Sequence, residues 1–307
     1  MKNLIFIYLA FLSVPLIASP HRQKAGILRD TTGISFQLPE IPVVLTEPTE
    51  RCAWLLEHFW DKFNFADTNL IHHPEVSEQA FADFISVLPH GRPADIEKGI
   101  GILIKKAAYS PKIFNYFAGL AEKYLYDPNS PARNDELYIP FLEKLLSSPI
   151  LSRTDKIRPA YQLEMAQKNR PGTIATDFDY TLLSGKQQSL LQTPAEYLLL
   201  VFYDPECDHC QEILQGLITS SAIHQLIARH KLTVLAIYTE ANIPYWQSQR
   251  QQLPANWIVG HDREKIKNQN LYDLKAMPSL YLLNRTKQVL LKDTSLPVLF
   301  QKLTEIH

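Results

Sequence analysis

Apolar residues recur every three or four positions between residues 47 and 169, which is the spacing of one face of an α-helix. Prolines fall between the apolar runs, where helices are expected to begin or end. In one of these runs Ser77 is the predicted helix cap. The pattern is clearest in the segments RCAWLLEHFWDKF, SEQAFADFISVL, ADIEKGIGILIKKAAY, PKIFNYFAGLAEKYLY and DELYIPFLEKLLSS. The sequence therefore predicts an all-helical domain over residues 47–169.

The pattern changes after Arg170. Apolar and polar residues alternate on both sides of Ser184-Gly185, which predicts a β-hairpin. Two later runs of apolar and aromatic residues, EYLLLVFYD and KLTVLAIYT, are typical of strands that are buried on both faces. Helical spacing follows in QEILQGLI, AIHQLIARH, IPYWQSQRQQL and REKIKNQNLYDL, and a second hairpin is predicted from SLYLLN and QVLLK. Alternating strands and helices predict an α/β domain over residues 170–307.

The N-terminal residues 1–19 have the pattern of a secretory signal peptide: a basic start, a short apolar run and small residues at the end. The apolar run is shorter than the roughly 20 residues that comfortably span a bilayer. Pro20 is an unfavourable first residue for a cleaved product, so cleavage elsewhere and retention as a membrane anchor both stay open. Residues 20–46 are interpreted as an extended linker. We expect an exported protein in the periplasm or on the periplasm-facing side of the cell envelope.

Composition narrows the function classes. A chain of 307 residues with 46% hydrophobic residues can form two domains with real cores. The formal net charge of −1 gives no basic field that would favour nucleic acid. Three cysteines are too few for a small disulfide-stapled domain. Two of them form a CxxC pair, and we expect the third, Cys52, to be buried without a disulfide to that pair.

The CxxC pair, Cys207-Asp208-His209-Cys210, follows a predicted strand and opens a predicted helix. Disulfide exchange needs a thiolate and a second thiol close by. Free backbone N–H groups and the helix dipole stabilise negative charge at a helix N-terminus, so Cys207 is the predicted nucleophile. Cys210 lies one turn further on and is the predicted resolving thiol. His209 can add a positive charge or an N–H donor near the sulfur.

This order of elements, with a CxxC pair at a strand-to-helix turn, resembles the thioredoxin fold over residues 170–307. An extra strand and helix before Met277-Pro278, and the hairpin DFDYTLLSGKQQSL, resemble the TlpA/ResA-type branch. The resemblance implies a central mixed sheet flanked by helices and a cis peptide at Pro278 that places backbone against the cysteines. Residues 47–169 resemble an uncharacterised helical domain found in front of some exported bacterial thioredoxin-like proteins, which implies no activity.

The chain departs from that family at several positions. Asp208-His209 replaces the usual Gly-Pro, and Glu206 replaces the usual tryptophan before the first cysteine. The acid that thioredoxins bury on the central strand corresponds to Val201, which leaves the proton route for Cys210 open. Glu240, after the next predicted strand, is either a substitute for that acid or a solvated loop residue.

We therefore expect an exported thiol-disulfide oxidoreductase that acts on protein thiols or disulfides, with Cys207, Cys210, His209 and Pro278 at its site. The expected partners are exported proteins with cysteines, a membrane electron donor is a further candidate, and no nucleic acid or cofactor is implied. Three alternatives stay open. The cysteines could carry copper or zinc, form a permanent structural disulfide, or be a vestigial pair in a binding module.

Overall fold

The computed structural model describes residues 36–306. The predicted signal peptide over residues 1–19 and the first part of the predicted linker, up to residue 35, lie outside the described residues. Residues 36–46 contain no helix or strand, and Phe36 stacks on Phe59 of the helical region with ring centroids 5.5 Å apart. Within residues 36–306, none of the helices combines the length and the hydrophobicity that crossing a bilayer requires.

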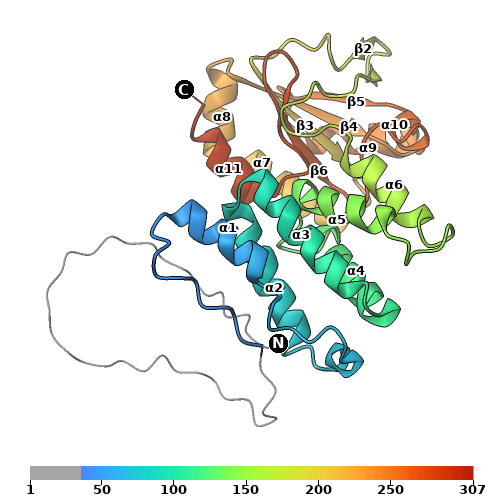
Figure 1. The fold of residues 1–307 in the computed structure, drawn as a ribbon. Helices are drawn as coiled ribbons and strands as arrows, with labels where there is room; N and C mark the ends of the chain where they lie inside the picture. The colour runs from blue at the N-terminus through green and yellow to red at the C-terminus, as the bar shows by residue number, and fades with distance from the viewer. Residues whose placement is uncertain (1–35, 307) are drawn as a thin grey trace, which may run out of the picture. The chain divides into compact units, whose positions relative to one another are not determined.

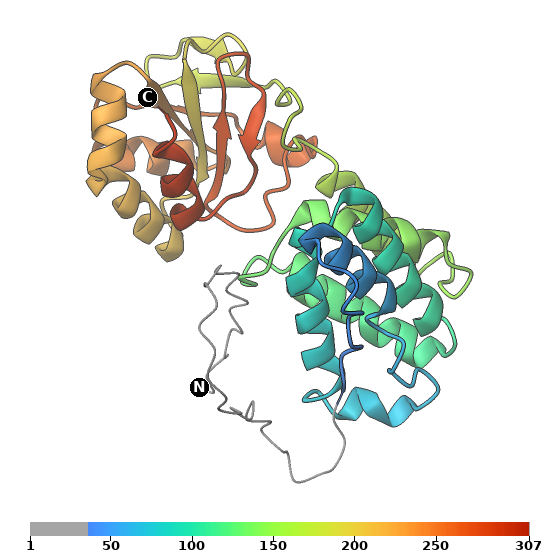
Figure 2. The same cartoon turned by 60° about the vertical axis from the view of Figure 1, so that its left-hand side comes forward.

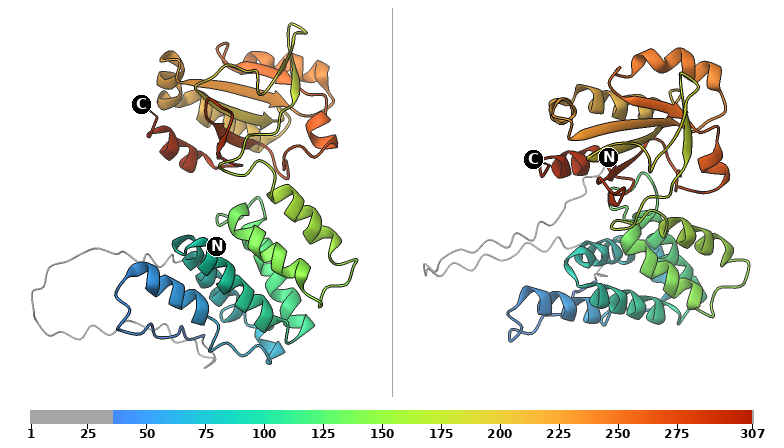
Figure 3. Two further views of the ribbon diagram at one scale, coloured as in Figure 1. Left: turned by 45° about the horizontal axis from the view of Figure 1, so that its top comes forward. Right: turned by 90° about the horizontal axis from the view of Figure 1, so that it is seen from above.

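Helices make up the first region of the fold, between Pro48 and Ala166 (Figure 1). The helices are α1 (Pro48–His58), α2 (Ser77–Val87), α3 (Pro93–Ala107), α4 (Pro111–Leu125), α5 (Asp135–Ser147) and α6 (Ile157–Ala166), with short 3-10 turns at Thr68–His72 and Leu88–His90. Prolines stand in the first turn of α1, α3 and α4, where their missing N–H has no partner in the helix to lose. Neighbouring helices run alongside one another in both views of Figure 3 and bury an aromatic-rich core.

Two details of this region differ from the sequence prediction. Ser77 is the first residue of α2 and not its cap, because its hydroxyl bonds the carbonyl of His73 at 3.2 Å and the hydroxyl of Tyr116 at 2.7 Å. Helix α6 was not among the predicted segments; its apolar positions are few, and it buries only Gln162, Met165 and Ala166.

The second region is a seven-stranded sheet in the order β2-β1-β5-β4-β3-β6-β7. Its strands are β1 (Asp179–Leu182), β2 (Gln187–Ser189), β3 (Tyr197–Tyr203), β4 (Leu232–Tyr238), β5 (Ile258–His261), β6 (Ser279–Leu283) and β7 (Val289–Leu291). Strands β3, β4 and β5 are parallel, whereas the hairpins β1–β2 and β6–β7 join them antiparallel. The mixed sheet is therefore confirmed, and β3 lies in its interior, as its unbroken apolar run predicted.

Helices cover both faces of the sheet. They are α7 (Asp208–Thr219), α8 (Ser221–Ala228), α9 (Ile243–Gln249), α10 (Lys265–Asn268) and α11 (Leu296–Leu303), with a 3-10 turn at Arg250–Gln252. Helices α7, α8 and α11 share one apolar core with the sheet, and α10 contributes to the core on the opposite face (Figure 2). The prediction of a mixed sheet flanked by helices, behind an all-helical region, is confirmed.

Helix α10 is shorter than predicted. The sequence pattern extended it to Leu274, but it ends at Asn268. Asn270 takes a positive φ of 51°, which no helix interior allows. The chain then turns Tyr272 into the core, where its hydroxyl donates to the carbonyl of Thr176 at 2.7 Å. Tertiary packing of one aromatic side chain thus overrides the local helical spacing.

Candidate functional site

The two cysteines of the CxxC pair lie where β3 passes into α7. Cys207 is the N-cap of α7, and its Sγ accepts a hydrogen bond from the backbone N–H of Cys210 at 3.4 Å. The first turn of α7 therefore directs a backbone N–H at this sulfur. This geometry stabilises negative charge on a thiolate at position 207.

Cys210 has a different environment. It is fully buried, whereas Cys207 is partly exposed. Burial raises the pKa of the Cys210 thiol; hydrogen bonding to the Asp204 backbone opposes this, and the negative charges of Cys207 and Asp204 add to it. Both cysteines are free thiols in the structure. An accessible sulfur at the helix end and a protected one a turn later is the arrangement that attack and resolution require.

Pro278 lies beside the cysteines. The Met277-Pro278 peptide is cis, as the resemblance implied. The carbonyl oxygen of Met277 lies 3.7 Å from Sγ of Cys207, close enough to accept a hydrogen bond from the thiol. Pro278 directly precedes β6, which pairs with β3, so the sheet itself brings this segment to the end of β3.

His209 is placed differently from the other predicted site residues. Its side chain is 64% exposed, and its Nδ1 lies 3.5 Å from a carboxylate oxygen of Glu212 on the next turn of α7. The imidazole therefore contacts a carboxylate and not a sulfur. The structure brings Cys207, Cys210 and the Met277-Pro278 peptide together and leaves His209 on the solvent side of the helix.

Aromatic side chains that the sequence analysis did not single out pack with Cys210 in the core under α7. Trp246 of α9 donates from Nε1 to the hydroxyl of Tyr203 at 2.9 Å and stacks on Tyr238, with ring centroids 6.3 Å apart. Burial raises the pKa of Tyr203 and raises that of Tyr238 to about 12. Both tyrosines are the last residues of parallel strands that pair in register. The signal available in the sequence was a tyrosine at the end of each of the two apolar runs.

The structure also shows which acidic side chains lie near the site. Val201 is buried in β3, so the carboxylate that thioredoxins place there is absent from that position. Glu240 forms an ion pair with Lys267. Asp204, which the sequence analysis did not single out, is half-buried, and its Oδ1 accepts the backbone N–H of Glu206 at 3.0 Å. Of these positions, Asp204 is the one whose charge influences the Cys210 thiol.

Two other features do not involve the cysteines. Within residues 36–306, no three His, Cys, Asp or Glu side chains are grouped so that they could hold a metal ion. A hollow of about 890 Å³ is lined by residues such as Ala195, Glu196 and Lys287. It lies at the N-terminal end of β3, whereas the cysteines follow the C-terminal end.

Comparisons with known proteins agree with this fold. The family model of a domain of unknown function, DUF5106, matches residues 18–169. The crystal structure of a thioredoxin-like protein from Bacteroides caccae ATCC 43185 is 46% identical, with a TM-score of 0.85 over 89% of this chain and 99% of that chain. This match confirms the thioredoxin-like fold behind the helical region.

Two further crystal structures each cover 44% of this chain. The C-terminal domain of an uncharacterized protein from Bacteroides fragilis NCTC 9343 is 46% identical over 44% of this chain and 98% of that chain, with a TM-score of 0.44. A conserved protein of unknown function from Bacteroides fragilis is 35% identical over 44% of this chain and 98% of that chain, with a TM-score of 0.42. No curated protein matches the chain.

Proposed function

The chain belongs to the thioredoxin-like proteins, and from that premise we propose that it is a thiol-disulfide oxidoreductase acting on other proteins through Cys207 and Cys210. One observation carries the proposal. An accessible cysteine caps α7, and a buried cysteine with a raised thiol pKa follows one turn later. A purely structural disulfide between Cys207 and Cys210 would add little stability to the fold, because the same helix already holds the two residues in place.

The reaction proceeds in two exchanges when the reduced protein meets a client disulfide. The Cys207 thiolate attacks one client sulfur, a mixed disulfide forms, and the other client sulfur leaves as a thiolate. Cys210 then loses its proton and attacks the Cys207 sulfur. The Cys207–Cys210 disulfide forms, and the second client sulfur leaves as a thiolate. The proton from Cys210 and one proton from water convert the two client thiolates into a dithiol. Two electrons pass from the protein to the client, and the same steps in reverse oxidise a client.

The Met277 carbonyl and the segment that follows it support the proposed activity on protein clients. An extended client chain needs a backbone edge beside the attacking sulfur, and the Met277 carbonyl lies beside the Cys207 sulfur. We assign Pro278 to client positioning and not to proton transfer, because proline carries no titratable group.

We further propose that the protein is exported and of the TlpA/ResA type. Residues 1–19 support export, and the hairpin β1–β2 and the inserted α9–β5 segment support the type. Its partners would be exported proteins with cysteines, and a membrane electron donor would keep the pair reduced. Cell fractionation and N-terminal sequencing of the mature protein test the location; recovery in the cytoplasm with an intact N-terminus contradicts it.

Trapping with Cys210→Ser tests the activity. This variant lacks the resolving thiol, so it should hold clients as mixed disulfides on Cys207, whereas Cys207→Ser should hold none. Insulin reduction by the wild type, with and without a chelator, is the companion assay. Absence of both reduction and trapping rejects the oxidoreductase, and activity that a chelator abolishes indicates a metal-dependent function. A Cys207→Ser variant that traps more partners than Cys210→Ser shows that the two roles are reversed.

A further inference from the structure

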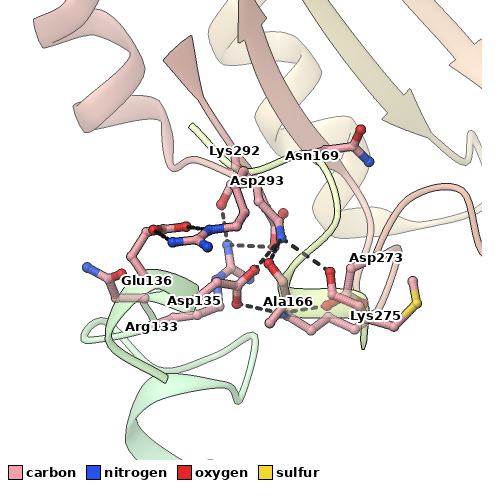
Figure 4. Close-up of polar contacts among 12 residues, drawn as sticks. Arg133, Asp135, Glu136, Ala166, Asn169, Asp273, Lys275, Lys292 and Asp293 are labelled. Atoms are coloured by element: carbon pink, nitrogen blue, oxygen red, sulfur yellow. Dashed lines mark hydrogen bonds and ion pairs between the residues drawn. The ribbon is translucent and has the colours of Figure 1, made fainter. Parts of the chain in front are cut away.

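The segment that carries Pro278 is held by side chains from the helical region. Asp135 is the first residue of α5, and its two carboxylate oxygens face two lysines of the sheet region (Figure 4). Oδ1 lies 3.3 Å from Nζ of Lys275, and Oδ2 lies 2.9 Å from Nζ of Lys292. Lys275 precedes Met277 by two residues, so this contact fixes the segment on the N-terminal side of Pro278.

A second contact holds the other side of Pro278. Arg133, just before α5, donates to the backbone carbonyl of Asp293 at 2.7 Å and lies 3.3 Å from its Oδ2. The Oδ1 atom of Asp293 accepts a hydrogen bond from the hydroxyl of Ser279 at 2.8 Å. Ser279 is the residue directly after Pro278. The helical region therefore reaches the chain on both sides of the proline, through Asp135 and Lys275 on one side and through Arg133 and Asp293 on the other.

These side chains belong to one charged cluster, defined by Arg133, Asp135, Asp273, Lys275, Lys292 and Asp293. The cluster is well shielded from water: the side chain of Lys292 is 4% exposed, that of Lys275 10% and that of Asp135 11%. Lys275 is bound further by Asp273 at 2.9 Å and by the ring face of Tyr126 in the helical region at 4.0 Å. Shielded ion pairs with several partners each have little freedom to rearrange, so the cluster holds the segment rigidly.

The cluster is linked to the reactive sulfur through one short stretch of backbone. Lys275 is held by Asp135, and two residues later the Met277 carbonyl contacts Cys207. A shift of Lys275 would therefore be transmitted to the carbonyl beside the sulfur. Neither Arg133 nor Asp135 needs to touch a client or a cysteine to exert this effect.

We infer that Arg133 and Asp135 of the helical region are positioning residues for the redox site, because they hold the segment from Lys275 to Ser279 against Cys207. The inference rests on the proposed function and gives the helical region a role in it. When Asp135 no longer binds Lys275, the Met277 carbonyl moves away from the Cys207 thiol. The sulfur then becomes more open to small reagents, while the backbone edge that receives a protein client is lost.

The test compares Asp135→Asn with Glu136→Gln. Glu136 is the next residue of α5, but its bidentate partner is Arg170, which does not belong to the segment around Pro278. We expect Asp135→Asn to speed alkylation of Cys207 by iodoacetamide by about threefold to tenfold and to slow insulin reduction by a similar factor. Glu136→Gln should leave both rates within about twofold of the wild type. Circular dichroism melts establish that each variant is folded at the assay temperature.

A milder variant covers the case in which Asp135→Asn does not fold. Arg133→Lys keeps the charge but loses the forked geometry of the guanidinium. Like Asp135→Asn, it should speed alkylation of Cys207 and slow insulin reduction, each by about twofold to threefold. Equal alkylation rates in the wild type, Glu136→Gln and the folded cluster variants overturn the inference. If both rates fall together, the substitution has damaged the site generally, and the inference is likewise overturned.

The alkylation arm separates this inference from the proposed function, since it needs no client. A wild type that reduces no insulin while Asp135→Asn still speeds alkylation rejects the oxidoreductase but keeps the positioning role. A wild type that reduces insulin, with Asp135→Asn matching Glu136→Gln in both rates, keeps the oxidoreductase and rejects the positioning role.

Discussion

Sγ of Cys207 accepts the backbone N–H of Cys210 at 3.4 Å, yet one side chain is partly exposed and the other is fully buried. In the reduced protein we therefore expect iodoacetamide to modify Cys207 at least about tenfold faster than Cys210 at neutral pH, because the buried thiol keeps its proton. Mass spectrometry of the peptide that carries both cysteines, with one or the other replaced by serine, measures the two rates. Comparable rates would contradict the assignment of nucleophile and resolving thiol.

The raised pKa of Cys210 predicts a loss of stability in alkali. A thiol that ionises in the unfolded chain at about pH 8.5 but stays protonated when folded gives its full stabilisation below that pH. As the pH rises further, the free energy of unfolding should fall by up to about 1.4 kcal/mol per pH unit for this group. Urea denaturation of the reduced protein between pH 7 and 10 measures the slope. Cys210→Ala should show a shallower slope than the wild type, and equal slopes would show that this thiol does not contribute.

Tyr203→Phe should destabilise the sheet region. The substitution removes the acceptor of the Trp246 Nε1–H and leaves that donor buried without a partner. An unsatisfied buried donor costs about 1–3 kcal/mol, which should appear in the urea denaturation midpoint. Tyr109→Phe is the matched control, because Tyr109 is 75% exposed and should change stability by less than about 0.5 kcal/mol. A Tyr203→Phe effect no larger than the control would mean that the indole has found another acceptor.

Cys52 should take no part in disulfide chemistry. It is buried in the core of the helical region, and its Sγ lies 3.9 Å from the carbonyl of Val87. Burial raises the pKa of its thiol, and the negative charge of Asp95 adds to this. Mass spectrometry of the oxidised protein should find the Cys207–Cys210 disulfide and a free Cys52 that reacts only after unfolding. A linkage between Cys52 and either of the other two cysteines would contradict the prediction.

His209→Pro should make the Cys207–Cys210 disulfide less oxidising. Proline is tolerated in the first turn of α7, and the substitution removes a side chain that can place positive charge near the thiolate. Interactions of exposed charges are worth about 0.2–1 kcal/mol, so the potential should fall by roughly 5–20 mV.

We expect the wild-type potential to lie between about −270 and −120 mV and nearer the lower value. Equilibration with glutathione measures both proteins. An unchanged or higher potential in the variant would show that Glu212 and the neighbouring acids cancel the effect of the imidazole.

The sequence by itself determined the features that depend on near neighbours in the chain. Apolar spacing of three to four residues marked five helices of the helical region, and the unbroken run of Tyr197–Tyr203 marked an interior strand. The two-residue spacing of Cys207 and Cys210 at a helix start put one sulfur at the cap and the other inside, because one helical turn sets that geometry. The place of Pro278 came from the resemblance and not from any local pattern.

Only the tertiary structure decided which distant residues meet. Tyr203 and Trp246 are 43 residues apart, and Lys275 and Asp135 are 140 apart, so no local period relates them. Tyr272 ended α10 early because a place in the core outweighed helical spacing. Charged residues such as Asp135 and Lys275 look like solvated surface in the sequence, since burial of a charge is stable only with a partner and the chain order does not reveal the partner. The contacts that hold the segment around Pro278 therefore became visible only in three dimensions.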